Sequence, residues 1–350
     1  MPHIPAVKAR HGATDTELGF VLLAMAAGAV VALPLAGPLV VRFGSRAMTS
    51  AAALAFCLAM PLPVLSPSLP LTAAALAVLG ACNGLLDVAM NAQAAAVERG
   101  LGRAVMSSFH ALFSVGGLAG ALLAGGAMLA GAGEAPHVVG AALLALAVVI
   151  AALPALLPST RDRTPAAPAL VWPPRALLVL GGLAFLGLLA EGAMADWSAV
   201  YLRDVVGTGP SVAATGFAAF SLAMAAGRFA GDALVNRFGA AAVVSVSGAV
   251  AAGGLGAALL VGGALSGVAG MALVGRGIAN IVPVLFAAAA RTPGIAPGRA
   301  LAAVATTGYL GFLAGPPLIG ALAGVAGLPA GLALVSVACA LVAARGGAVR

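Results

Sequence analysis

Long apolar runs dominate this chain, and short polar segments separate them. A helix needs about 20 apolar residues to cross the hydrocarbon core of a bilayer. Eleven runs meet that need, near 18–41, 47–65, 70–96, 104–130, 138–157, 176–201, 211–236, 240–262, 264–290, 300–325 and 328–344. Many of them are rich in glycine and alanine, which suits helices packed closely in a membrane. The pattern predicts an all-α, polytopic membrane protein.

The composition points the same way. Of the 350 residues, 62% are apolar and 8% are charged, and the mean hydropathy is +1.13. Soluble domains have about 45–50% apolar and about 25% charged residues. So few charges could not cover the surface of a soluble globule of this size, whereas a protein embedded in lipid does not need to.

The cations are distributed unevenly between the two sides of the predicted membrane. If successive loops alternate, twelve arginines fall on one side, and only Lys8, Arg10 and Arg203 on the other. By the positive-inside rule the C-terminus is cytoplasmic, as expected for a multi-pass protein of the inner (cytoplasmic) membrane. The net charge of +7 comes from scattered arginines, so it does not indicate a nucleic-acid-binding face.

An internal repeat divides the chain. A shift of 195 residues places Arg42-Phe43-Gly44 on Arg237-Phe238-Gly239 and Gly80 on Gly275. We therefore expect an N-terminal bundle of five helices at 1–157, a cytoplasmic linker at 158–175 and a C-terminal bundle of six helices at 176–350. The span 176–201 has no counterpart in the first half. This predicts a missing first helix upstream of Met1, through either a mis-set start or a true truncation.

Two segments carry a family resemblance. Gly37-Pro-Leu-Val-Val-Arg42-Phe-Gly44-Ser-Arg46 resembles the signature loop of the major facilitator superfamily, G-x-L-x-D-R-x-G-R-K, and the second half repeats it. The aspartate of the signature is replaced by Val41 in one copy and Asn236 in the other. The resemblance implies two pseudo-symmetric bundles and a gating loop that helps to close one face. The gating residues it implies are Gly37, Arg42, Gly44, Arg46, Arg228, Asp232, Arg237 and Gly239.

A second resemblance is narrower. Leu86-Asp87-Val-Ala-Met-Asn91, followed by Phe109-His110-Ala-Leu-Phe-Ser114, is similar to the fucose–proton symporter branch of the superfamily and its bacterial relatives. The resemblance implies proton-coupled sugar uptake. It also implies that the spans 70–96, 176–201 and 264–290 line a central cavity.

Polar residues inside the spans are costly, about 2.5–3.5 kcal/mol for each ionisable group, and usually mark a pathway. Asn83, Asp87 and Asn91 stack on one helical face at intervals of four. His110 enters the next span at a similar depth, so we expect Asp87 and His110 to approach each other and exchange a proton with water. The alternative is a set of static hydrogen bonds between helices.

The second half offers further candidates. Glu191 and Arg276 are expected at similar depth, where they would pair and either bind substrate or serve as a structural ion pair. Asn280 shares the helical face of Arg276, and Asp196 lies nearer the outer end. Trp197 is either an interfacial anchor or a surface for stacking on a sugar ring. Tyr309 adds a contact from the span 300–325. The glycines at 116, 117 and 120 are expected at close helix packing.

The favoured interpretation is a secondary active transporter that moves a small polar solute, a sugar as first guess, by alternating access with protons. The expected partners are that solute, protons and lipid, with no nucleic acid, and the chain is expected to be a monomer. Efflux of drug-like compounds is the alternative, and a transport-inactive receptor or sensor is an alternative of another class. We expect no enzyme, metal or cofactor, because the chain lacks G-x-x-x-x-G-K-[ST] and H-E-x-x-H motifs, and its cysteines, Cys57, Cys82 and Cys339, lack metal-ligand spacing.

Overall fold

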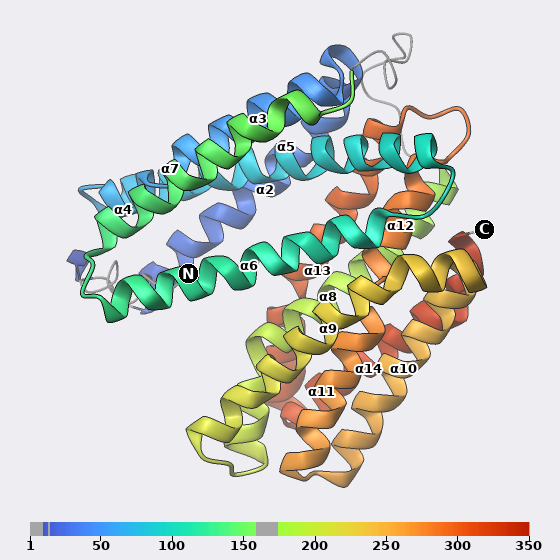
Figure 1. The fold of residues 1–350 in the computed structure, drawn as a ribbon. Helices are drawn as coiled ribbons and strands as arrows, with labels where there is room; N and C mark the ends of the chain where they lie inside the picture. Colours follow the sequence, from blue (N-terminus) through green and yellow to red (C-terminus); the bar gives the residue numbers. More distant parts are fainter. Residues whose placement is uncertain (1–9, 13–14, 159–173, 350) are drawn as a thin grey trace. The chain divides into compact units, whose positions relative to one another are not determined.

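The computed structural model describes residues 10–12, 15–158 and 174–349, and within these ranges the protein is almost entirely helical, without strands (Figure 1). Each predicted span coincides with a helix or an interrupted pair of helices. They are α2 (Asp15–Phe43), α3 (Ser45–Ala59) with α4 (Leu62–Leu65), α5 (Leu69–Leu101), α6 (Met106–Leu129), α7 (Glu134–Ala152), α8 (Arg175–Val200), α9 (Pro210–Phe238), α10 (Ala240–Val261), α11 (Ala264–Ile278) with α12 (Ile281–Ala290), α13 (Pro297–Ala326) and α14 (Leu328–Arg345). The all-α membrane fold is confirmed.

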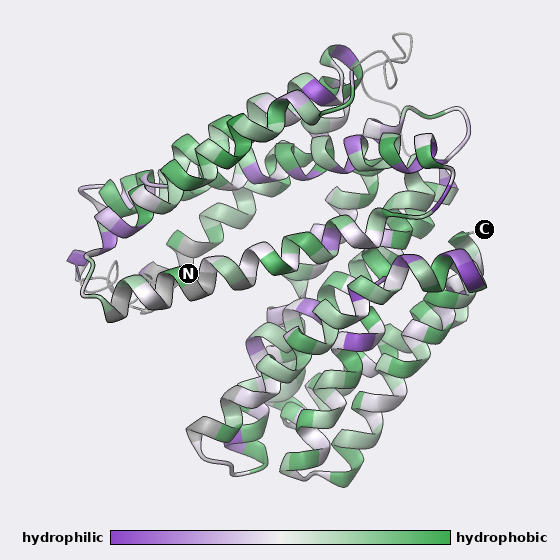
Figure 2. Cartoon of the chain, viewed as in Figure 1, coloured by the Kyte–Doolittle hydropathy of each residue, from purple (hydrophilic) through white to green (hydrophobic). Residues whose placement is uncertain are grey.

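Ten helical segments of the described residues are long and apolar enough to cross a membrane, and α6 occupies the remaining predicted span. Figure 2 shows apolar residues along most of each helix, with hydrophilic residues at helix ends and at a few positions within the helices. This distribution is expected where lipid surrounds the helices, because a hydrocarbon environment cannot solvate polar side chains.

The described residues belong to two compact units. Unit 1 lies within Met1–Val97, Phe113–Val171 and Gly294–Ala302, and unit 2 within Glu98–Leu112, Trp172–Pro293 and Ala303–Arg350. The start of α6 therefore belongs to unit 2 and the start of α13 to unit 1. The expected linker at 158–175 lies mostly outside the described residues, and the expected bundle boundaries at 157 and 176 stay a prediction.

The helices of the two halves follow the repeat. The first residues of α2 and α9, Asp15 and Pro210, lie 195 positions apart, and so do their last residues, Phe43 and Phe238. The starts of α3 and α10, and those of α5 and α11, have the same spacing. The repeat predicted from a few glycine and arginine matches is thus a repeat of secondary structure.

The turn after each copy of the Arg-Phe-Gly triplet explains its glycine. Gly44 has φ 85° and ψ 151°, and Gly239 has φ 81° and ψ 155°. L-residues with a side chain are strained at positive φ, whereas glycine adopts it without penalty. Because both turns share one backbone conformation, the chain passes from one helix to the next in the same way in both halves.

A second pair of glycines marks equivalent helix crossings. A Cβ atom at Gly80 on α5 would overlap the backbone carbonyl of Met25 on α2, and one at Gly275 on α11 would overlap that of Phe220 on α9. Both partners of the two contacts are related by the same shift of 195. Two halves with little side-chain identity therefore retain the same close backbone contact.

The core of unit 2 forms where α10 packs against α11 and α14, and α9 packs against α11. Val244, Leu255, Met271 and Leu332 are almost fully buried there. The close packing expected at three α6 glycines is not found: within the described residues, nothing lies within 4 Å of a Cβ built at Gly116, Gly117 or Gly120. Small residues alone do not specify a contact, because they also occur on faces that contact lipid.

Candidate functional site

Asp87 lies on α5 in unit 1 and is held by a residue one turn later. The side-chain amide of Asn91 donates hydrogen bonds to the Asp87 backbone carbonyl at 2.8 Å and to Oδ1 at 3.1 Å. Asn91 is buried, and Asn83 is half-buried. The other carboxylate oxygen of Asp87, Oδ2, is buried with no hydrogen-bond partner among the described residues. The structure therefore joins Asp87 to Asn91 and leaves one buried oxygen available for a proton.

The expected approach of Asp87 and His110 stays a prediction, because these residues belong to different units. His110 lies on the part of α6 that belongs to unit 2. Its ring contacts the ring of Phe286 edge-on, with the ring centroids 6.0 Å apart. The local surroundings of His110 thus include an aromatic side chain from α12.

The ion pair of Glu191 is corrected by the structure. Its carboxylate lies 3.7 Å from a terminal nitrogen of Arg228 on α9, so Arg228 replaces Arg276 as the partner expected from the sequence. The Arg228 side chain is 9% exposed and that of Glu191 is 26% exposed. The sequence analysis assigned Arg228 to the gating loop because of its position before the second signature copy. Helix α9 instead directs it into the interior of unit 2.

Helix α11 ends at Ile278 and α12 begins at Ile281, although the sequence predicted one continuous span. Pro283 explains part of this interruption, because proline has no N–H to donate to the carbonyl four residues earlier, that of Ala279. The Nε–H of Arg228 donates to the Ala279 carbonyl instead, at 3.4 Å. A side chain from α9 thus compensates for the hydrogen bond that proline removes.

Asn280 lies at the same interruption and is fully buried. Its side-chain amide donates to the Gly227 carbonyl at 3.0 Å, while its Oδ1 has no hydrogen-bond partner among the described residues. Arg276 is half-buried, and its guanidinium lies alongside Gly227. The interruption between α11 and α12 is therefore bonded to α9 through Arg228 and Gly227, and Arg228 in turn pairs with Glu191.

The remaining pathway candidates lie on α8 and α13. Asp196 is exposed, and the Trp197 ring lies against Gly320 of α13, 3.6 Å from where a Cβ would stand. The indole nitrogen of Trp197 is buried without a hydrogen-bond partner in the described part of the chain. The Tyr309 ring contacts that of Phe312 edge-on. A π-helical turn, Tyr201–Val205, follows α8, and such turns are frequent at functional sites.

A second polar site surrounds the first turn of α6, and we call it the α6-start cluster: Glu98, Asp232, Asn236 and the segment 104–108. Asp232 accepts hydrogen bonds from the backbone N–H groups of Ser107 at 2.9 Å and Ser108 at 2.8 Å, and from the Ser108 hydroxyl. The first N–H groups of a helix have no partner within the helix, and a carboxylate there also complements the helix dipole. Asp232 therefore caps α6 from another helix.

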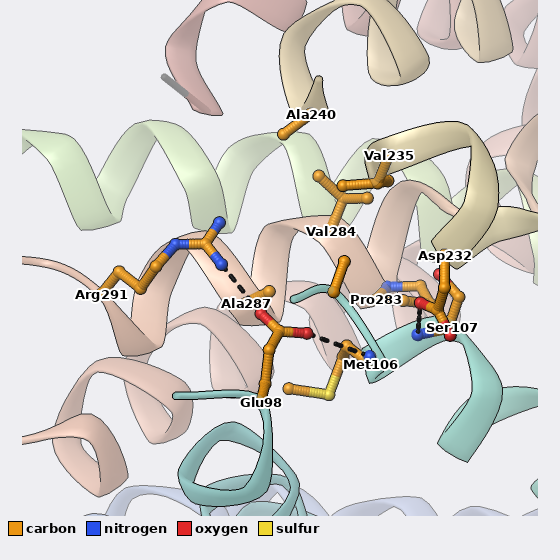
Figure 3. A pocket seen from close by; sticks show the side chains of 11 residues that line it. Glu98, Met106, Ser107, Asp232, Val235, Ala240, Pro283, Val284, Ala287 and Arg291 are labelled. Carbon is orange, nitrogen blue, oxygen red and sulfur yellow. Dashed lines mark hydrogen bonds and ion pairs between the residues drawn. The ribbon is translucent and has the colours of Figure 1, made fainter. Parts of the chain in front are cut away.

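Glu98 and Asn236 complete the α6-start cluster. Glu98 accepts hydrogen bonds from the N–H groups of Val105 and Met106, both at 3.0 Å, and forms a 2.8 Å ion pair with Arg291. The Asn236 side chain accepts from the N–H of Ala104 at 3.0 Å and donates to its carbonyl at 3.3 Å. Figure 3 shows Glu98 between Arg291 and Met106, with Asp232 pointing at Ser107. The hollow between them, about 20 Å³, has room for a single water.

The first signature copy has apolar or small residues at the positions equivalent to Asp232 and Asn236, namely Gly37 and Val41. The position equivalent to Asp232 is Gly37, and a Cβ there would stand 3.0 Å from the Cβ of Ala302 and from the Cα of Arg299, near the start of α13. Arg42 lies over the ring of its neighbour Phe43, and Arg237 lies over Phe238, each at 5.2 Å from the ring centroid. Arg46, in the first turn of α3, is half-buried.

Sequence reasoning missed Glu98, Asn236, Ser108 and Arg291. A partial signal existed: a glutamate ends one span, and two serines begin the next one. A carboxylate before a helix and serines in its first turn are typical of capping. The ion pair between Glu98 and Arg291 could not be predicted from a local pattern, because the two residues lie almost two hundred positions apart.

Comparison with known proteins agrees with the fold. The Major Facilitator Superfamily sequence profile matches residues 1–295. An uncharacterized MFS-type transporter of Yersinia pestis is 38% identical over 99% of this chain and 90% of its own length. The membrane protein MosC of Rhizobium meliloti is 36% identical over 97% of this chain and 84% of its own.

Solved structures are similar in fold at lower identity. The major facilitator transporter FucP in its outward conformation superposes with a TM-score of 0.80 at 15% identity, over 99% of this chain and 93% of that one. The human organic anion transporter MFSD10 gives a TM-score of 0.76 at 17% identity, over 100% of this chain and 89% of that one. At such identities the similarity establishes the fold alone.

Proposed function

The chain belongs to the major facilitator superfamily, and we propose that it is a secondary active transporter that moves a small polar solute together with protons by alternating access. The observation that carries the proposal is the environment of Asp87. One of its oxygens is bonded to Asn91, and the other is buried with no hydrogen-bond partner in the described part of the chain.

A carboxylate in this position suits a proton carrier. An ionised group within a bilayer is costly, and binding a proton removes that cost. Oδ2 is the atom on which the proton would reside, because Oδ1 already accepts from Asn91. Exposure of this oxygen to water on one side and then on the other would load and release the proton during the transport cycle.

The polar groups of unit 2 are the candidates for binding the solute. Glu191, Arg228 and Arg276 supply charges, and Asn280 and Tyr309 supply hydrogen-bonding groups. Such groups recognise hydroxyls and carboxylates. A sugar is the first candidate for the solute. A structure similar in fold, at 15% identity, is described as that of the fucose:proton symporter of Escherichia coli.

The α6-start cluster is the candidate gate. It contains Asp232, which begins the second signature copy, and its hydrogen bonds join α9 to the N–H groups that begin α6. Breaking these bonds would release the start of α6 from α9 and expose the freed N–H groups to water. We expect the cluster to form in one state of the cycle and to open in another.

Asp87→Asn tests the proposal in proteoliposomes loaded with a panel of labelled sugars. We expect loss of accumulation driven by a proton gradient and retention of solute exchange, because asparagine keeps the hydrogen bonding but cannot carry a proton. Asp204→Asn, which changes an exposed carboxylate just after α8, is the matched control and should keep accumulation. Unchanged accumulation in Asp87→Asn would refute the coupling role. Proton-driven transport of drug-like compounds in place of sugars would favour the efflux alternative. Binding of a solute without any exchange would favour the sensor.

The membrane and orientation are part of the same proposal. The excess of arginine on alternate loops supports the cytoplasmic membrane with the C-terminus in the cytoplasm. A reporter enzyme that is active only outside the cytoplasm, fused after Arg350, should be inactive. The same reporter inserted between α9 and α10 should also be inactive, whereas one inserted between α8 and α9 should be active.

A further inference from the structure

Two exposed arginine–phenylalanine pairs occupy equivalent positions in the two halves of the chain. Phe43 is 43% exposed and Phe238 is 57% exposed, and the guanidinium groups of Arg42 and Arg237 each lie 5.2 Å from the neighbouring ring centroid. Each pair ends a long apolar helix, α2 or α9, immediately before the positive-φ glycine. We propose that each pair binds the headgroup of an anionic phospholipid.

The position suits a lipid headgroup. Both pairs end helices of membrane-spanning length, so they lie near the boundary between hydrocarbon and headgroups. A cation next to that boundary faces the phosphates of the lipids. An exposed phenylalanine beside an exposed arginine therefore presents an apolar surface to the acyl chain and a charge to the phosphate.

The contact with the ring does not require the hydrogen-bond donors of the arginine. A guanidinium that lies over an aromatic ring uses its face, whereas its N–H groups point outward in the guanidinium plane. Those N–H groups form bidentate hydrogen bonds with phosphate oxygens. The ring thus restricts the orientation of the arginine without occupying its donors.

The replaced signature aspartate removes a counter-charge from each pair. The residue directly before the arginine is Val41 in one half and Asn236 in the other, and the Asn236 side chain is bonded to Ala104. Among the described residues, the ion pairs involve neither Arg42 nor Arg237. Both arginines therefore carry a positive charge that an external phosphate can neutralise.

The two sites differ in charge. In unit 1, Arg46 follows Arg42 by four positions across the Gly44 turn, whereas the equivalent position in unit 2 is Ala241. Two cations attract an anionic headgroup more strongly than one, by about fivefold in affinity per arginine. The site at Arg42 is therefore the tighter of the two.

Native mass spectrometry of the full chain, titrated with phosphatidylglycerol against phosphatidylcholine, tests the proposal. We expect two phosphatidylglycerol molecules per chain beyond the phosphatidylcholine background, and one each in Arg42→Ala and Arg237→Ala. Arg42→Lys/Arg237→Lys should retain both molecules at lower affinity, because lysine keeps the charge without the planar fork. Phe43→Ala and Phe238→Ala should each lower the affinity for one of the two phosphatidylglycerol molecules about threefold or more.

Arg345→Ala and Arg99→Ala are matched controls, since both arginines are exposed near helix ends and lack a neighbouring phenylalanine. Equal losses in these controls would refute specific sites in favour of general surface charge. Retention of both molecules in an Arg42→Ala/Arg237→Ala double variant that still melts cooperatively would also overturn the proposal. Glycerol 1-phosphate provides the headgroup without acyl chains; if it competed as well as the lipid, the site would bind phosphate and not phospholipid.

Discussion

The carboxylate of Asp232 accepts the backbone N–H of Ser107 at 2.9 Å, whereas the residues equivalent to this pair in the other half, Gly37 and Ala302, meet through a close apolar contact. The two halves thus retain the same contact position with different chemistry. A capping carboxylate gives a charged, hydrogen-bonded contact that water competes for, while glycine against alanine depends on close packing. We therefore expect salt and solvent to weaken the contact between Asp232 and Ser107 more than the contact between Gly37 and Ala302.

Asp232→Ala should destabilise the chain by about 1–2 kcal/mol, because the first turn of α6 loses its capping acceptor. Thermal unfolding in detergent measures this effect. Combined with Ser108→Ala, the loss should be smaller than the two single effects added, since the Ser108 hydroxyl bonds to the same carboxylate. Strict additivity would show that the two side chains do not interact.

Arg228→Ala should be far more damaging than Arg276→Ala. Removing Arg228 leaves the Glu191 carboxylate without its ion-pair partner, a change that typically costs about 3–5 kcal/mol for a buried pair. It also leaves the Ala279 carbonyl without its donor. The free energies of unfolding of Arg228→Ala and Arg276→Ala measure the difference. A Glu191→Gln/Arg228→Met double variant replaces both members of the ion pair. The paired replacement should recover part of the loss, and an equal effect of the two alanine variants would contradict the assignment.

Gly80→Ala and Gly275→Ala should destabilise by similar amounts, about 1–3 kcal/mol each, because the added methyl group overlaps a backbone carbonyl that cannot rotate away. Gly116→Ala is the control, since nothing in the described residues approaches a Cβ there. It should be neutral or stabilising by up to about 1 kcal/mol through helix propensity. Melting temperatures of the three variants in one detergent give the comparison. A neutral result at either crossing glycine would mean that the helices separate at little cost.

Gly44→Ala and Gly239→Ala should each cost about 1–3 kcal/mol, because both turns combine a positive φ with a ψ near 150°, a region essentially restricted to glycine. Gly253→Ala, within α10 and open to its surroundings, should not lower stability. Denaturation of the purified variants distinguishes backbone strain from a general intolerance of substitution. If Gly253→Ala were as harmful as the other two, strain at the turns would not be the cause.

The placement of the membrane-spanning segments was predictable from the sequence. Apolar runs of membrane-spanning length dictate helices, because a chain in lipid must satisfy its own backbone hydrogen bonds. The repeat was predictable from Arg-Phe-Gly, since only glycine accepts the backbone of the turn that follows each phenylalanine. The proximity of Asn91 to Asp87 followed from helical spacing.

The partners between helices were not predictable from the sequence. Depth along the span suggested Arg276 for Glu191, but the rotation of α9 directs Arg228 to it. The interruption at Ala279 and Asn280 depends on Pro283 together with a donor from another helix. Glu98 and Arg291 lie 193 positions apart. Local sequence specifies which residues share a helix face, whereas only the packing of helices decides which faces meet, and that packing depends on side chains distributed along the whole chain.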